Sequence, residues 1–150
     1  MASNDDNTSD NSFESAVEQL AIEIDSSCDQ GNTCRLRNAL DSIDACLAKQ
    51  PNAPTAALLQ YFAANAWSGI RRVVQKQSHA KWNWQQPEME KEVFFLRSSM
   101  QNPGFASLPD ARQCQVATNL GNSLSTFGRF IEAIEYWNQA LKLNPRFSMA

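Results

Sequence analysis

Two amphipathic segments joined by a short turn constrain the fold of this chain more than any other feature. They lie in "NLGNSLSTFGRFIEAIEYWNQALKLNP", residues 119–145. Apolar residues recur there at helical spacing, Gly128 stands in the turn and Pro145 follows the second segment, which predicts two helices. Gly121 lies inside the first of them, where glycine costs about 1 kcal/mol relative to alanine. We therefore expect another helix to pass close to this position.

The same periodicity runs through most of the chain. It predicts helices over residues 13–28, 33–49, 54–77, 87–101, 110–126 and 129–143. No run of alternating apolar and polar residues rich in β-branched side chains predicts a strand, so the fold class is all-α. Because most of the loops are short, neighbouring helices should pair antiparallel as helical hairpins. Residues 1–11 are polar and acidic and should form a disordered tail, which leaves residues 12–150 as the helical region.

Composition restricts the class of protein. The chain has 150 residues, and the 43% that are apolar can supply a core. It shows neither a secretory signal nor an apolar stretch of about 18 residues, so we expect a cytoplasmic protein without a membrane span. The four cysteines include no CxxC pair and His79 is the single histidine, so we expect idle thiols, no metal site and no cofactor.

Charge is unevenly distributed along the chain. Residues 1–44 carry ten acidic side chains against two basic ones, residues 45–87 carry five basic and no acidic ones, and the remainder balances. Either the acidic segment packs against the basic one, or the basic segment binds an external acidic partner. Bases and aromatics mix in Arg71, Arg72, Lys76, Lys81, Trp82 and Trp84, a combination that can bind nucleic acid. The net charge of −3 favours a solvated helix face followed by anchoring tryptophans instead.

Residues 114–147 resemble a tetratricopeptide repeat (TPR), a 34-residue helical hairpin with small and aromatic residues at fixed offsets. The positions that carry the resemblance are Leu120, Gly121, Leu124, Ala133, Trp137, Ala140 and Pro145. Ala117 departs from the pattern, which has tryptophan there. A partial second match covers about residues 20–51, with Ser26 and Ser27 in place of the Leu-Gly pair. The resemblance implies stacked antiparallel hairpins, an α-solenoid, in which Gly121 and Ala133 let two helices cross closely.

The resemblance also implies a binding surface. Stacked repeats form an extended concave surface, which in this family is lined mainly by the first helix of each pair. The residues placed on it are Gln115, Thr118, Asn119, Asn122 and Ser125. Amide side chains can donate to and accept from a peptide backbone, although the asparagines could equally serve only to solubilise the face. Some members bind a terminal carboxylate through lysine and arginine at the places that Gln115 and Thr118 occupy, so that mode is not supported.

No catalytic constellation is visible in the sequence. His79 has no partner of a catalytic kind nearby in the sequence, and Glu88, Glu90 and Glu92 suit the positive end of a helix dipole without further function. We therefore expect a protein–protein interaction scaffold. The alternative is a regulatory N-terminal array of a larger effector, such as a nuclease, with the basic segment near nucleic acid.

The end of the chain suggests a longer array. A single repeat cannot bury its apolar face, so about three stacked repeats are normally needed for stability. Residues 148–150 stand where a further repeat would begin. We expect Ile134, Trp137 and Leu141 to pack inward, while Phe130, Ile131, Phe147 and Met149 find no cover. Such an edge would favour self-association.

Overall fold

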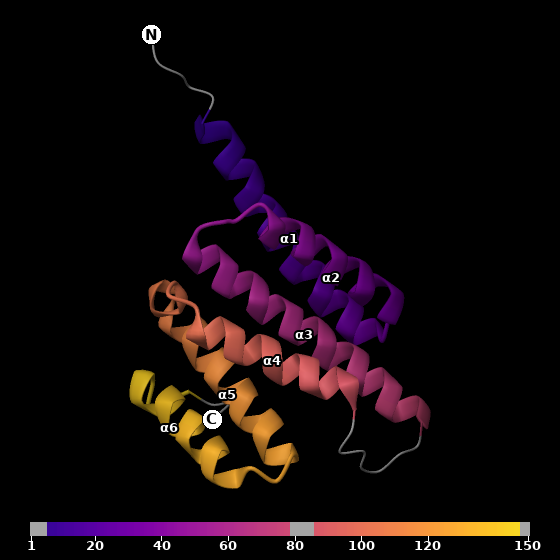
Figure 1. The fold of residues 1–150 in the computed structure, drawn as a ribbon, viewed down its shortest axis with the longest axis vertical. Coiled ribbons are helices and arrows are strands. Elements are labelled where there is room, and N and C mark those ends of the chain that lie inside the picture. Colours follow the sequence, from indigo (N-terminus) through magenta and orange to yellow (C-terminus); the bar gives the residue numbers. More distant parts are fainter. Residues whose placement is uncertain (1–5, 79–85, 148–150) are drawn as a thin grey trace.

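The computed structural model describes residues 6–78 and 86–147, which form six α-helices arranged as three hairpins (Figure 1). The hairpins are α1 (Asp6–Gln30) with α2 (Thr33–Ala48), α3 (Ala53–Ser78) with α4 (Pro87–Gln101), and α5 (Asp110–Thr126) with α6 (Phe130–Leu143). A single turn of 3₁₀ helix, η1 (Phe105–Ser107), lies between α4 and α5. The described ranges contain no strand, and the predicted all-α class is confirmed.

The helix boundaries follow the sequence closely, with one difference at the start of the chain. α4 and α5 begin and end at the predicted residues, whereas α1 begins at Asp6 rather than near residue 13. Residues 6–11, expected in a disordered tail, are therefore helical, and residues 1–5 lie outside the described residues. Once Val17 and Leu20 are buried and hold the helix, adding further turns costs little compared with starting one.

Two tight turns reverse the chain within hairpins. Gly31 and Gly128 have φ angles of 63° and 77°, a left-handed conformation that glycine adopts without a steric penalty. After α5 the Arg129 N–H donates to the Leu124 carbonyl at 3.0 Å and the Gly128 N–H donates to Ser125 at 3.0 Å. This is the hydrogen-bond pattern of a Schellman cap, and the glycine after α1 ends that helix in the same way.

Each hairpin stacks on the next, so the core is continuous along the molecule. α2 packs on α3 and α4 packs on α5, while α3 also contacts α1. Figure 1 shows the hairpins following one another in sequence order. The largest fully buried apolar side chains come from all three hairpins: Ile24, Leu36, Ile43, Leu59, Ile70, Leu96, Leu120, Leu124 and Val116.

Gly121 makes the contact that its position predicted. A Cβ atom there would lie 2.5 Å from Trp137 Nε1 and 3.1 Å from the Ala133 carbonyl oxygen, so α6 lies directly against this glycine. Ala133 and Ala140 are fully buried on the same side of α6, while Trp137 is half-buried. The missing side chain thus makes room for the indole ring and for the backbone of α6.

The prediction of which residues form the inner face of α6 was partly wrong. Ile134 and Leu141 were expected to pack inward, but they are 50% and 38% exposed. The helix turns its small residues, Ala133 and Ala140, toward α5 because these allow the two backbones to approach closely. The large residues of the neighbouring stripe are left at the surface.

Candidate functional site

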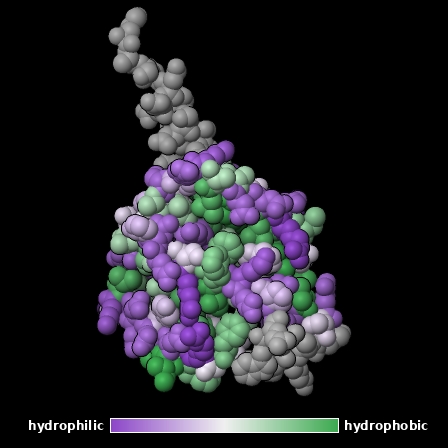
Figure 2. Space-filling model, viewed as in Figure 1, coloured by the Kyte–Doolittle hydropathy of each residue, from purple (hydrophilic) through white to green (hydrophobic). Residues whose placement is uncertain are grey.

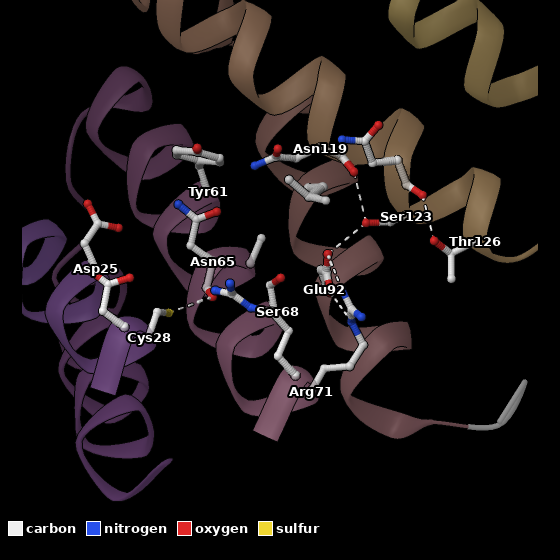
Figure 3. A pocket seen from close by; sticks show the side chains of 15 residues that line it. Asp25, Cys28, Tyr61, Asn65, Ser68, Arg71, Glu92, Asn119, Ser123 and Thr126 are labelled. Carbon is white, nitrogen blue, oxygen red and sulfur yellow. Dashed lines mark hydrogen bonds and ion pairs between the residues drawn. The ribbon is translucent and has the colours of Figure 1, made fainter. Parts of the chain in front are cut away.

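A groove opens between the first helices of the three hairpins. It has a volume of about 650 Å³ and is lined by side chains of α1, α3 and α5 and by Glu92 and Leu96 of α4, with Glu92 at its floor (Figure 3). We call it the concave groove. It opens here because α3 packs on α1, α2 and α4, whereas α5 packs on α4 and α6. The first helices of the second and third hairpins, α3 and α5, are thus connected through α4, which packs on both of them.

A polar network ties the floor of the groove together. Arg71 Nε donates to Glu92 Oε2 at 2.7 Å, and the Ser123 hydroxyl donates to Glu92 Oε1 at 2.8 Å. Gln75 extends the network, since it accepts from Arg71 Nη1 at 3.2 Å and donates to Gln86 at 2.9 Å. Glu92 is only 5% exposed. A buried carboxylate needs such partners because an isolated buried charge is costly.

Two asparagines on opposite sides of the groove keep their side-chain amides free. Asn65 of α3 and Asn119 of α5 both line it and both are half-buried. Within the described ranges, neither side-chain amide has a hydrogen-bond partner; only their backbone carbonyls accept bonds, from Cys28 and Ser123. Figure 3 shows the two amides extending into the space between α3 and α5. Each can donate two hydrogen bonds and accept others.

Charged side chains of both signs stand at the α1 wall. Asp25, Asp29 and Arg72 are exposed there, around the half-buried thiol of Cys28. Burial raises the pKa of the Cys28 thiol, and the guanidinium of Arg72 opposes that rise. The thiol is therefore protonated at neutral pH and a poor nucleophile. All four cysteines are free.

The acidic segment packs against the basic one, which was the first of the two alternatives, since α1 and α2 both contact α3. In the described part of the chain no ion pair joins α1 to α3; Arg71 of the basic segment pairs instead with Glu92 of α4. The side chain of Arg71 is only 16% exposed and is paired with Glu92 at the floor of the groove. It is therefore not available to bind the phosphates of a nucleic acid. Lys81, Trp82, Trp84 and His79 lie outside the described residues. No group of three metal-binding side chains occurs within the residues that the structure describes.

A smaller cavity of about 210 Å³ extends the surface past Tyr61 and Asn65. Arg112 of α5 lies there with its guanidinium 5.2 Å from the Tyr61 ring centroid, and its Nη1 donates to Gln115 at 2.8 Å. The cavity shares Asp25, Tyr61 and Asn65 with the concave groove. The two therefore form one surface along α3.

The structure brings together only part of the predicted binding set. Asn119 and Asn122 line the concave groove, and Gln115 lines the smaller cavity. Thr118 is fully buried, on the stripe between Cys114 and Gly121 that faces α6, so it cannot face the groove. Ser125 lines neither space.

Sequence reasoning missed the side of the groove formed by α3. Tyr61, Asn65 and Ser68 line it and recur at helical spacing within a mostly apolar helix. That polar stripe was the available signal. Nothing in the sequence showed that it would face α5.

The predicted repeat positions lie in the packed part of the last hairpin. Leu120, Gly121, Leu124, Ala133 and Ala140 are buried, and Pro145 is exposed after α6. Stacked antiparallel hairpins with a concave surface define the class of helical-repeat interaction modules. Within that class, a family model described as tetratricopeptide repeat matches residues 114–147, which confirms the resemblance for that segment. No curated protein and no solved structure matches the chain.

A membrane span was not expected from the sequence. In residues 6–78 and 86–147, no helix combines the length and the apolar character that crossing a bilayer requires.

Proposed function

We propose that the protein binds an extended segment of a partner protein in the concave groove. The repeat at residues 114–147 supports a role as a protein–protein interaction module, since repeats of this family are typically non-catalytic scaffolds. The observation that carries the proposal is the pair of free amides, Asn65 and Asn119, on opposite sides of one groove. Half-buried amides without partners can recover hydrogen bonds from a peptide backbone at little cost in desolvation.

The length of the groove indicates the size of the bound segment. From Tyr61 to Arg72 the groove-lining residues of α3 are separated by eleven residue steps, or roughly 16 Å at 1.5 Å per step. An extended chain rises about 3.3 Å per residue, so this length corresponds to roughly five residues. The floor offers no free charge because Arg71 and Glu92 neutralise each other. Recognition therefore rests mainly on backbone hydrogen bonds.

A selection from random dodecapeptides displayed on phage tests this function. Peptides recovered on the wild-type protein should bind less tightly to Asn65→Ala and to Asn119→Ala. Each loss of one backbone hydrogen bond should weaken affinity about two- to twelvefold. Fluorescence anisotropy of the labelled peptide measures the change.

Asn138→Ala is the matched control, because Asn138 is an exposed asparagine of α6 that lines neither the groove nor the smaller cavity. It should bind the selected peptide like the wild type. If the peptides bind both groove variants as tightly as this control, the concave groove is not the binding surface.

A second candidate function is self-association through α6. Phe130, Ile134 and Leu141 share one stripe of this helix and are 61%, 50% and 38% exposed. In Figure 2 hydrophilic residues cover much of the visible face, and hydrophobic ones reach the surface at the lower left, where Figure 1 places α6. A stripe of this kind can pair with the same stripe of a second copy about a two-fold axis.

Sedimentation velocity over a range of protein concentrations tests this second proposal. The wild type should sediment faster as the concentration rises, and Ile134→Glu should not. Ile22→Glu is the matched control, because Ile22 of α1 is an equally apolar side chain that is 61% exposed. A wild type that stays monomeric at every concentration would exclude the self-association.

A further inference from the structure

A third cavity lies on the other side of α4 from the concave groove. It has a volume of about 540 Å³ and apolar walls formed by Val93 and Phe94 of α4 and by Leu124 and Phe127 at the end of α5. Phe94 lies two residues, or about 200° of helical rotation, from the groove-floor residue Glu92. The two spaces therefore lie on opposite sides of α4. We call this one the α4–α5 pocket.

Two arginines at the edge of the α4–α5 pocket share one carboxylate. Arg97 Nη2 lies 3.2 Å from Glu132 Oε2, and Arg129 Nε lies 2.6 Å from Glu132 Oε1. One negative charge thus faces two positive ones. Glu90 also lines the pocket, but it is seven residues from Arg97, roughly 10 Å along the helix. It forms no ion pair within the described ranges.

Arg97 also has an unused donor. Its Nε is buried and has no hydrogen-bond partner in the described part of the chain, although about a third of the side chain is exposed. A buried donor without a partner is destabilising. A carboxylate entering the pocket could accept from an Nη of this guanidinium, in the charge-assisted hydrogen bond that arginine favours.

We propose that the α4–α5 pocket binds a partner segment in which a large apolar side chain is followed by an aspartate or glutamate. The apolar side chain fills the space between Phe94 and Phe127, and the carboxylate binds Arg97. The volume lies in the range of small-ligand sites, about 300–1,000 Å³. The charge excess at Arg97 and Arg129 selects the acidic residue. This site does not depend on the concave groove.

Titration with capped dipeptides, followed by ¹H–¹⁵N NMR, tests the proposal. The probe is acetyl-Phe-Asp-amide, and acetyl-Phe-Asn-amide is its uncharged match. The first should shift the signals of Val93, Leu124 and Phe127 and of the Arg97 Nε–H, and should bind about tenfold more tightly than the second. Arg97→Gln should remove that difference while leaving the weaker binding in place.

A pair of phenylalanine variants, matched in exposure, distinguishes binding in the α4–α5 pocket from binding elsewhere on the surface. Phe94 and Phe130 are 62% and 61% exposed, but only Phe94 lines the α4–α5 pocket. Phe94→Ala should weaken the binding of acetyl-Phe-Asp-amide, and Phe130→Ala should not. Groove variants such as Asn119→Ala should also leave it unchanged, so this proposal and the proposed function fail separately. Shifts absent at the solubility limit, equal affinities for the two probes, or shifts centred on Phe130 would each overturn the proposal.

Discussion

The α5–α6 hairpin and the junction of α3, α4 and α5 are held together by different means. Within the hairpin, Gly121 and Ala133 let two backbones approach until an indole ring covers the glycine. At the junction, a half-buried arginine, a buried glutamate and a buried serine bridge three helices beneath the concave groove. The close apolar contact fixes the geometry of one repeat. The polar network fixes how that repeat stands against its neighbour, and so sets the shape of the groove.

Breaking the polar network should have the largest effect. Arg71→Met keeps the apolar stem but leaves Glu92 buried without its cation, which should lower the free energy of unfolding by about 3–5 kcal/mol. Chemical denaturation measures this loss. The double variant Arg71→Met with Glu92→Met removes both charges and should recover much of the stability. An Arg71→Met protein within experimental error of the wild type would show that the junction does not rest on this pair.

Crowding the hairpin should have the next largest effect. Gly121→Leu should cost about 1–3 kcal/mol, because the new side chain meets Trp137 and the backbone of α6. Gly121→Ala should also destabilise, since even a Cβ atom would stand 2.5 Å from the indole nitrogen.

Ala45→Gly measures the helix-propensity term alone, because Ala45 is exposed within α2. It should lower stability by about 1 kcal/mol or less. If Gly121→Ala instead raises the melting temperature, the close contact between α5 and α6 is not what requires glycine.

The smallest effect is expected where the two regions meet. Asn122 lines the groove, and its Oδ1 accepts a hydrogen bond from Trp137 Nε1 at 3.1 Å. Asn122→Ala should therefore lower stability by about 0.5–1.5 kcal/mol, and Trp137→Phe should make the loss non-additive in a double-mutant cycle. Asn138→Ala provides the baseline. Equal melting temperatures for Asn122→Ala and Asn138→Ala would show that the hydrogen bond between Asn122 and Trp137 does not stabilise the hairpin.

The sequence predicted local structure better than it predicted which residues face each other. Helix ends followed from signals close in the chain, such as Gly128 after α5 and Pro87 at the start of α4. Gly121 could be interpreted because its unusual place within a helix demanded a close neighbour. In α6, periodicity showed that Ile134 and Leu141 share a stripe, but not that the helix would turn its alanines inward.

The candidate site was harder to predict because it depends on the stacking of hairpins. Asn65 and Asn119 are 54 positions apart in the chain and line the same groove only because α4 separates α3 from α5. Glu92 suited a helix N-terminus from the sequence alone, and its pairing with Arg71 needed the relative placement of α3 and α4. The family pattern placed Thr118 in the groove, whereas here it lies against the hairpin partner.

The side-chain amide signals of Asn65 and Asn119 test the central claim most directly. Both can be followed by ¹H–¹⁵N NMR while a groove-selected peptide is added to the wild-type protein. The account predicts that both pairs of NH₂ signals shift and exchange more slowly with solvent at saturation, while those of Asn138 do not change. Saturating peptide that leaves the Asn65 and Asn119 signals in place would contradict binding through the concave groove.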